Sequence, residues 1–184
     1  MDALQQDQHY TFADLLTWDD DDEYWELIDG VPYLMASPIR VHQSICGEIF
    51  RQLANFLTGK PCRVYSALGV RLNADEGDDT FLIPDISVVC DDAKLDKYGC
   101  RGAPDMVVEI LSPSTSARDR WIKFNQYLQA GVREYWIVDP DSRTLSVHVL
   151  ENGKYVTTAY GDTGTVSVRV LDGCVISLPD VFSE

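Results

Sequence analysis

The 184-residue sequence lacks several features that mark large classes of proteins. No apolar run approaches the ~20 residues that a membrane-spanning helix needs. The polar first residues, 1–10, lack the basic start and apolar stretch of a signal peptide. There is also no Walker loop, no dinucleotide-binding glycine pattern and no G-x-S-x-G elbow. We therefore expect a soluble, cytoplasmic protein that uses none of these chemistries.

Paired cysteines and histidines are missing as well. The five cysteines include no C-x-x-C pair, and the three histidines, His9, His42 and His148, are scattered. A structural zinc site needs such ligands at close, regular spacing. Cys46 and Cys90 lie in apolar patterns, where a free thiol behaves as a small hydrophobic group. The sequence predicts neither a disulfide scaffold nor a structural zinc site.

Positive charge is scarce, since 15 Lys and Arg face 30 Asp and Glu and the formal net charge is −15. Nucleic-acid binding depends on Lys and Arg that neutralise phosphates, so an acidic chain starts at a disadvantage. Part of the excess is the acidic run at residues 19–23. This run lacks the glycine and spaced ligands of a calcium loop and is predicted to be an exposed loop or helix entry.

What is present predicts one α+β domain over residues 1–184, in agreement with the length. Asp29-Gly30 between apolar segments predicts a hairpin, because a type I′ turn needs positive φ at both central positions. Two principal helices are predicted, one opened by Ser37-Pro38 and ended near Gly59, the other over residues 118–130.

The remaining apolar and alternating segments predict a mixed or antiparallel β-sheet. The predicted strands before the second helix are residues 64–72, 82–90 and 106–111. Another follows at residues 134–138, and residues 144–178 are typical of a C-terminal β-meander.

Two carboxylates, Asp85 and Glu109, lie inside apolar segments. A lone ionised carboxylate in such a setting costs several kcal/mol unless a cation, a partner or a raised pKa offsets the cost. If their strands pair suitably, both side chains can point at one small volume, and their hard oxygens would suit Mg²⁺. The alternative is that both lie at strand ends, solvated or bonded to backbone amides.

Lys123 lies in the second predicted helix and shares a face with Tyr127, four residues on. The opposite face carries Trp121, Phe124 and Leu128 at core spacing. The helical pattern alone therefore predicts that Lys123 belongs to a solvated stripe. The functional alternative is an ammonium that clamps a phosphate or polarises an attacking water.

At this point the residues resemble the PD-(D/E)XK nuclease superfamily and, more closely, the Uma-type restriction-endonuclease-like family of bacterial proteins. The likeness extends from about Tyr10 to Pro140. Its motifs are Glu26-Leu27-Ile28-Asp29-Gly30, Ile83-Pro84-Asp85, Glu109-Ile110-Leu111-Ser112-Pro113-Ser114, Lys123 and Gly131-Val132-Arg133-Glu134-Tyr135-Trp136. The glutamate segment, with its downstream lysine and Glu-Tyr-Trp, is the specific part.

The resemblance implies a restriction-endonuclease-like core and hydrolysis of phosphodiester bonds, in DNA, with Mg²⁺ or Mn²⁺ bound by Asp85 and Glu109. The usual lysine position two residues after the glutamate is occupied by Leu111. In the family this lysine comes from the following helix, which corresponds to Lys123 here. Glu26 matches the N-terminal acidic position, where it would complete the metal shell or orient a water.

Other polar residues have weaker assignments. Pro104-Asp105 is a second Pro-Asp pair, but it does not match the metal-binding aspartate of the superfamily. It lies in the same predicted strand as Glu109 and not in the preceding one. His42 and Tyr127 match recurring family positions at the border of the site, although spacing alone predicts a packed core histidine at His42. Arg118 and Arg120 either meet a nucleic-acid backbone or face solvent.

Two other functional classes stay open. A catalytically silent nucleic-acid-binding or metal-binding module with the nuclease fold would agree with the charge of −15. A structural or assembly protein would use the C-terminal meander as an interface. In that case the apolar residues 135–138 would contribute to a homodimer, and otherwise they belong to the core.

Overall fold

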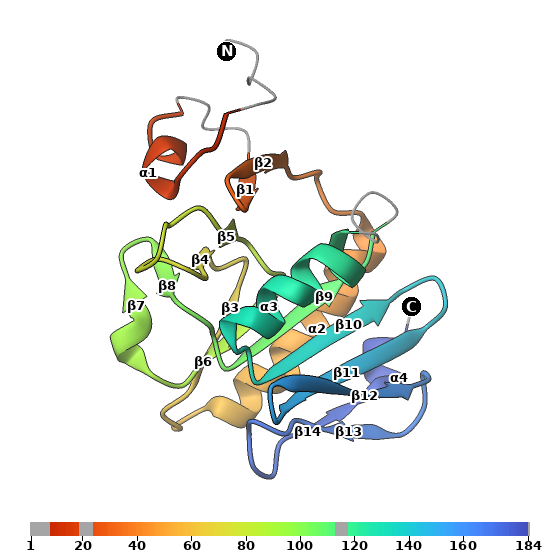
Figure 1. Ribbon diagram of the computed structural model, residues 1–184. Helices are drawn as coiled ribbons and strands as arrows, with labels where there is room; N and C mark the ends of the chain where they lie inside the picture. The colour runs from red at the N-terminus through yellow and green to blue at the C-terminus, as the bar shows by residue number, and fades with distance from the viewer. Residues whose placement is uncertain (1–7, 19–23, 113–117, 184) are drawn as a thin grey trace.

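The computed structural model describes residues 8–18, 24–112 and 118–183, and only the backbone of Arg118 and Asp119 (Figure 1). The acidic run 19–23 and the serines and threonine expected before the second helix, 114–116, lie outside these ranges. Within the described ranges, no helix is both long enough and apolar enough to cross a membrane. The predicted α+β class is confirmed, with a mixed sheet between two helices.

The two principal helices lie where they were predicted. Helix α2 spans Arg40–Leu57. The second helix begins as a π-helix over Arg118–Lys123 and continues as α3 over Phe124–Ala130. The described ranges also contain three short helices, α1 at Phe12–Leu15, a 3-10 turn at Asp92–Lys94 and α4 at Leu178–Val181.

The central sheet has six strands in the order β12-β11-β10-β9-β6-β3. Strands β9 and β10 are parallel and the other pairs are antiparallel. The bounds are β3 Arg63–Ser66, β6 Ile86–Val89, β9 Met106–Ile110, β10 Glu134–Asp139, β11 Thr144–Glu151 and β12 Lys154–Tyr160.

Helices α2 and α3 cover opposite faces of this sheet (Figure 1). Because side chains alternate along a strand, Ile86 and Val108 pack with Ile49 of α2, whereas Val107 packs with Tyr127 of α3. A sheet covered on both faces needs strands that are apolar throughout, which explains the short apolar runs in the sequence. This arrangement also buries any polar side chain placed at the sheet's centre.

Residues 135–138 lie in β10, between β9 and β11, and each is buried. Their assignment to the core is therefore confirmed. They cannot form a surface for a second copy of the chain, and the homodimer itself stays a prediction.

A second six-stranded sheet carries the N-terminal part, in the order β2-β1-β5-β4-β8-β7. Its hairpin turn is formed by Asp29 and Gly30, with φ values of 51° and 74°, as predicted for a type I′ turn. The bounds are β1 Trp25–Ile28, β2 Val31–Leu34, β4 Val70–Arg71, β5 Phe81–Leu82, β7 Leu95–Asp96 and β8 Gly99–Arg101.

Several predicted boundaries are wrong. The strand over residues 64–72 is broken into β3 and β4 at Ala67, whose φ is +51°. The strand over residues 82–90 is broken at Pro84, which cannot donate to a strand ladder, so β5 and β6 belong to different sheets. Helix α2 has Ile39 as its N-cap, without a side-chain cap, so Ser37 does not cap it.

The C-terminal meander is correct only for its first hairpin. Strands β11 and β12 meet at an Asn152-Gly153 turn and extend the central sheet. Strands β13 (Thr165–Ser167) and β14 (Val175–Ser177) instead form a separate two-stranded sheet. Their residues Val166 and Ile176 belong to the core cluster on the α2 side, so the predicted third and fourth meander strands do not extend the central sheet.

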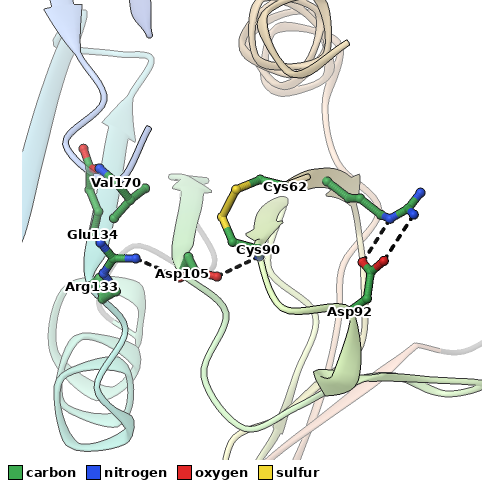
Figure 2. Close-up of a disulfide and its surroundings, with 8 residues drawn as sticks. Cys62, Cys90, Asp92, Asp105, Arg133, Glu134 and Val170 are labelled. Carbon is green, nitrogen blue, oxygen red and sulfur yellow. Dashed lines mark hydrogen bonds and ion pairs between the residues drawn. A yellow bond between two sulfur atoms is a disulfide. The ribbon is translucent and has the colours of Figure 1, made fainter. Parts of the chain in front are cut away.

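The expectation of a free thiol at Cys90 is also wrong, because Cys62 and Cys90 are bonded (Figure 2). Strands β3 and β6 pair Arg63 with Val89, so the next pair outward is Cys62 with Cys90. This register arises from strand pairing and leaves no trace in cysteine spacing. The remaining cysteines, Cys46, Cys100 and Cys174, are buried free thiols.

Candidate active site

Asp85 directly precedes the central strand β6, and Glu109 lies in its neighbour β9. The antiparallel register pairs Ile86 of β6 with Val108 of β9, so one further step brings Asp85 opposite Glu109. Directly opposed residues of an antiparallel pair are close neighbours. The thiol of Cys46 on α2 senses both carboxylates. Burial is the main cause that raises its pKa to about 11, and the negative charges of Asp85 and Glu109 raise it further. The two carboxylates therefore share one region of the protein.

Asp85 lies at a strand end, immediately before β6, and its carboxylate turns across the end of β9. Oδ2 accepts a hydrogen bond of 2.7 Å from the backbone N–H of Ile110 and lies 3.2 Å from Nε2 of His42. This agrees with the alternative of a strand-end carboxylate bonded to a backbone amide. Oδ1 accepts no hydrogen bond from the described residues, and the side chain is 20% exposed. One oxygen is thus held in place while the other is available to a ligand.

Glu109 is buried on the α3 face of the sheet. Its Oε1 lies 2.9 Å from Nζ of Lys123 and accepts a hydrogen bond of 2.8 Å from the hydroxyl of Tyr127. Burial and the nearby charge of Glu109 keep the pKa of Tyr127 well above its ordinary value. The tyrosine is therefore a neutral donor that orients Glu109.

Glu26 joins the same group from the second sheet, where it lies in β1. Its Oε1 lies 2.8 Å from Nζ of Lys123 and accepts a hydrogen bond of 2.9 Å from the N–H of Ile83. Glu26, Lys123 and Glu109 are 1%, 3% and 4% exposed. The ammonium thus bridges two buried carboxylates and links the two sheets.

The predicted orientation of the second helix is wrong. Lys123 and Tyr127 are buried, whereas Trp121 is 73% exposed and Phe124 and Leu128 are half-buried. The helix starts with a π-turn that ends at Lys123, and Lys123 and Tyr127, four residues apart, form the buried face. Lys123 consequently does not belong to a solvated stripe.

The remaining predicted residues are placed as follows. His42 is buried, as expected for a packed histidine, and also contacts Asp85. Arg120 pairs with Asp139, and the side chain of Arg118 lies outside the described part of the chain. Asp105 lies at the opposite end of β9 from Glu109, where it accepts from the N–H of Cys90 and pairs with Arg133 (Figure 2).

Two backbone donors belong to this group, and the sequence did not identify which amides they are. The N–H groups of Ile83 and Ile110 hold Glu26 and Asp85, respectively. Backbone amides carry no residue-specific signal, so only the strand arrangement reveals them. The proline before Asp85 is the nearest local hint, because it ends the ladder of β5 and leaves Asp85 at a strand end.

The charges and donor atoms fit one hard divalent cation. Glu26, Asp85 and Glu109 with Lys123 carry a net charge of −2, and the carboxylates offer the oxygen ligands that Mg²⁺ takes. No group of three His, Cys, Asp or Glu side chains in the described ranges is arranged to hold a metal. A cation bound by Asp85 and Glu109 would therefore keep several waters, as Mg²⁺ usually does.

Comparison with known proteins identifies the family of this chain. A family model described as "Uma2: Putative restriction endonuclease" matches residues 11–179. Uncharacterized protein slr1290 of Synechocystis sp. (strain ATCC 27184 / PCC 6803 / Kazusa) is 29% identical over 141 residues, which are 75% of this chain and 73% of that protein.

The fold is similar to that of "a putative nuclease belonging to DUF820" from Anabaena variabilis ATCC 29413, with a TM-score of 0.77 and 23% identity. The match covers 94% of this chain and 97% of the other, and at this identity it supports the fold alone. The family match spans residues 11–179, nearly the whole described chain. The protein therefore belongs to the Uma2 family of restriction-endonuclease-like proteins.

Proposed function

We propose that this protein is a metal-dependent nuclease that hydrolyses phosphodiester bonds in DNA. The observation that carries the proposal is the opposed pair Asp85 and Glu109, with the ammonium of Lys123 2.9 Å from Glu109. Buried charges at the centre of a sheet are costly, and a site that uses them explains why they are kept. Membership of a restriction-endonuclease-like family supports the same chemistry.

In this proposal Asp85 and Glu109 hold Mg²⁺ or Mn²⁺. When bound, such a cation supplies a water of lowered pKa and positive charge for the phosphate oxygens. His42 and the N–H of Ile110 fix Oδ2 of Asp85, so that Oδ1 faces the ligand. The hydroxyl of Tyr127 fixes Glu109 in the same way.

Lys123 contributes the cationic side chain of the reaction. Its ammonium is held between Glu26 and Glu109, and a fixed positive charge in a region shielded from water stabilises developing negative charge on a phosphate. Glu26 acts as a positioning residue, because it holds the ammonium while the N–H of Ile83 holds Glu26.

Nicking of supercoiled plasmid tests the proposal. Purified protein with Mg²⁺ or Mn²⁺ should nick the DNA, and chelation with EDTA should stop the reaction. Asp85→Asn, Glu109→Gln and Lys123→Ala should each abolish nicking. Asp172→Asn removes an exposed carboxylate elsewhere and should leave the rate unchanged. Equal rates in wild type and Asp85→Asn would refute the assignment.

The second candidate is a module that binds nucleic acid or metal without turnover, and the distribution of positive charge favours it. Most arginines are already neutralised by carboxylates of the same chain, which weakens any contact with phosphates. The paired arginines are Arg51, Arg63, Arg71, Arg101, Arg120, Arg133 and Arg143.

Titration calorimetry separates the two candidates. The protein is titrated with Mg²⁺ and then with a DNA duplex, and the recovered DNA is analysed on a gel. Binding with intact DNA would support the silent module, whereas binding followed by cleavage supports the nuclease. Asp85→Asn should lose the Mg²⁺ heat under either candidate.

A further inference from the structure

An aromatic cleft lies on the other side of β1 from Glu26. It has a volume of about 280 Å³. Trp25 lines the cleft and precedes Glu26 in β1, so the two side chains point to opposite faces of the strand. Ile83 also lines the cleft, and its N–H donates to Glu26. The cleft and the candidate active site are therefore separated by a single strand.

The walls of the cleft are rich in aromatic rings. Trp18 packs edge-on against Trp25 with ring centres 5.3 Å apart. Tyr24, which is 68% exposed, and Tyr98 lie at the open side. The lining residues are Phe12, Leu15, Leu16, Trp18, Tyr24, Trp25, Phe81, Ile83 and Tyr98.

One polar group of the cleft wall has no partner. The indole N–H of Trp25 is buried and makes no hydrogen bond within the described part of the chain. A buried donor without an acceptor is unfavourable, and native proteins seldom keep one without a reason. Its nitrogen has almost no exposed surface, so a ligand would reach it only if neighbouring side chains moved.

A cation lies beside the cleft and is available to a ligand. Nζ of Lys97 is 4.5 Å from the centre of the Tyr98 ring. Lys97 is exposed and forms no ion pair with the residues that the structure describes, in contrast to the arginines that are paired with carboxylates. Exposed rings beside a free ammonium match the chemistry of a nucleotide, which joins an aromatic base to a phosphate.

We propose that this cleft binds an unpaired base of a single-stranded nucleic acid, with Lys97 on the adjoining phosphate. The inference rests on the proposed nuclease function and names its substrate class. A duplex is bound largely through many phosphate contacts, which a chain of net charge −15 with paired arginines supplies poorly. Stacking of bases on aromatic rings tolerates any base and needs few cations. Tyr24 and Tyr98 supply the rings.

Binding is measured without cleavage, by fluorescence anisotropy of a labelled oligothymidylate in EDTA, with a hairpin duplex as the competing probe. Tyr24→Ala should weaken binding of the single strand roughly 5- to 150-fold, the range of one base–aromatic stack. Tyr24→Phe keeps the ring and should bind as wild type. Lys97→Ala should weaken binding and lower its salt slope by about 0.7, the contribution of one phosphate on a single strand. Lys154→Ala removes an exposed lysine on β12 and serves as the control.

The outcomes separate this inference from the proposed function. Tight binding of the single strand that is lost in Tyr24→Ala and Lys97→Ala, and kept in Lys154→Ala, supports the cleft even if no DNA is cut. If the protein cuts duplex DNA with a metal but does not bind the single strand, the proposal for the cleft is refuted and the proposed nuclease function is retained. Unchanged binding in Tyr24→Ala and Lys97→Ala also overturns it, as does a duplex bound as tightly as the single strand.

Discussion

Nζ of Lys123 lies 2.8 Å from Oε1 of Glu26, and both side chains are buried. Because Glu26 belongs to β1 and Lys123 ends the π-turn before α3, this ion pair joins the N-terminal sheet to the helix on the central sheet. The same ammonium contacts Glu109. The candidate site is therefore also a structural link, and its variants affect both activity and stability.

Removal of the ammonium should strongly destabilise the fold. Lys123→Met leaves Glu26 and Glu109 buried without their cation, which is expected to lower the free energy of unfolding by about 3–5 kcal/mol. Urea unfolding followed by circular dichroism measures this loss. Glu26→Gln in the Lys123→Met background should restore part of it, because one unpaired charge is removed. Lys154→Met is the exposed control, and equal losses in Lys123→Met and Lys154→Met would contradict the expectation.

A divalent cation should stabilise the protein. The candidate site has a net charge of −2, and a ligand that binds only the folded state raises the free energy of unfolding by about 2.7 kcal/mol at 100 times its Kd. Thermal unfolding should shift to higher temperature as Mg²⁺ is added. The shift should vanish in Asp85→Asn and persist in Asp172→Asn. A shift of the same size in both variants would place the cation elsewhere.

Stability should fall in mild acid because of His148. Burial lowers the pKa of His148 from 6.5 to about 4, and its Nδ1 is 2.7 Å from the Thr157 hydroxyl. Between these values the unfolded chain binds a proton that the folded chain does not, so stability is complete above pH 6.5 and is lost as the pH falls towards 4. The loss is about 3 kcal/mol.

The His148 contribution is isolated by comparison with His148→Gln. Other titrating groups contribute equally to both proteins, so the difference between their urea-unfolding curves should shrink from pH 7 to pH 4. Parallel curves over this range would show that His148 is not the group responsible.

Reduction should weaken the pairing of β3 with β6. The bond from Cys62 to Cys90 closes a loop with a sequence separation of 28, and such a loop contributes about 3–4 kcal/mol through the unfolded state. Dithiothreitol should therefore lower the unfolding temperature of the wild type. The double variant Cys62→Ser/Cys90→Ser should already unfold at the lower temperature and should not respond to the reductant. A wild type that is equally stable with and without reductant would contradict this expectation.

Local chemistry was enough to predict much of the fold. The turn at Asp29 and Gly30, the stop at Gly131 and the apolar runs of β9 and β10 depend on neighbouring residues alone. The boundaries that failed depend on distant contacts. Gly69 directly precedes β4, where the Phe81 ring and the Tyr98 carbonyl leave no room for a side chain, and neither neighbour is close in sequence.

The residues of the candidate site also divide into those that local sequence identified and those that depend on distant contacts. Asp85 and Glu109 stood out because a carboxylate inside an apolar segment is costly wherever that segment is placed. Lys123 did not, because Trp121, Phe124 and Leu128 suggested that the opposite helix face packs on the core. The carboxylates on two other strands explain its burial. The resemblance to a family brought Lys123 and Glu26 into the prediction before their contacts were known.

The sequence by itself determined the class of fold, the two helices and the two suspect carboxylates, since each follows from periodicity or from the cost of a charge among apolar neighbours. Tertiary structure alone decided the register that opposes Asp85 to Glu109 and Cys62 to Cys90. It also decided the burial of Lys123 between Glu26 and Glu109. Those relations join segments far apart in the chain, and a pairing between strands is set by how whole faces pack rather than by the residues that happen to meet.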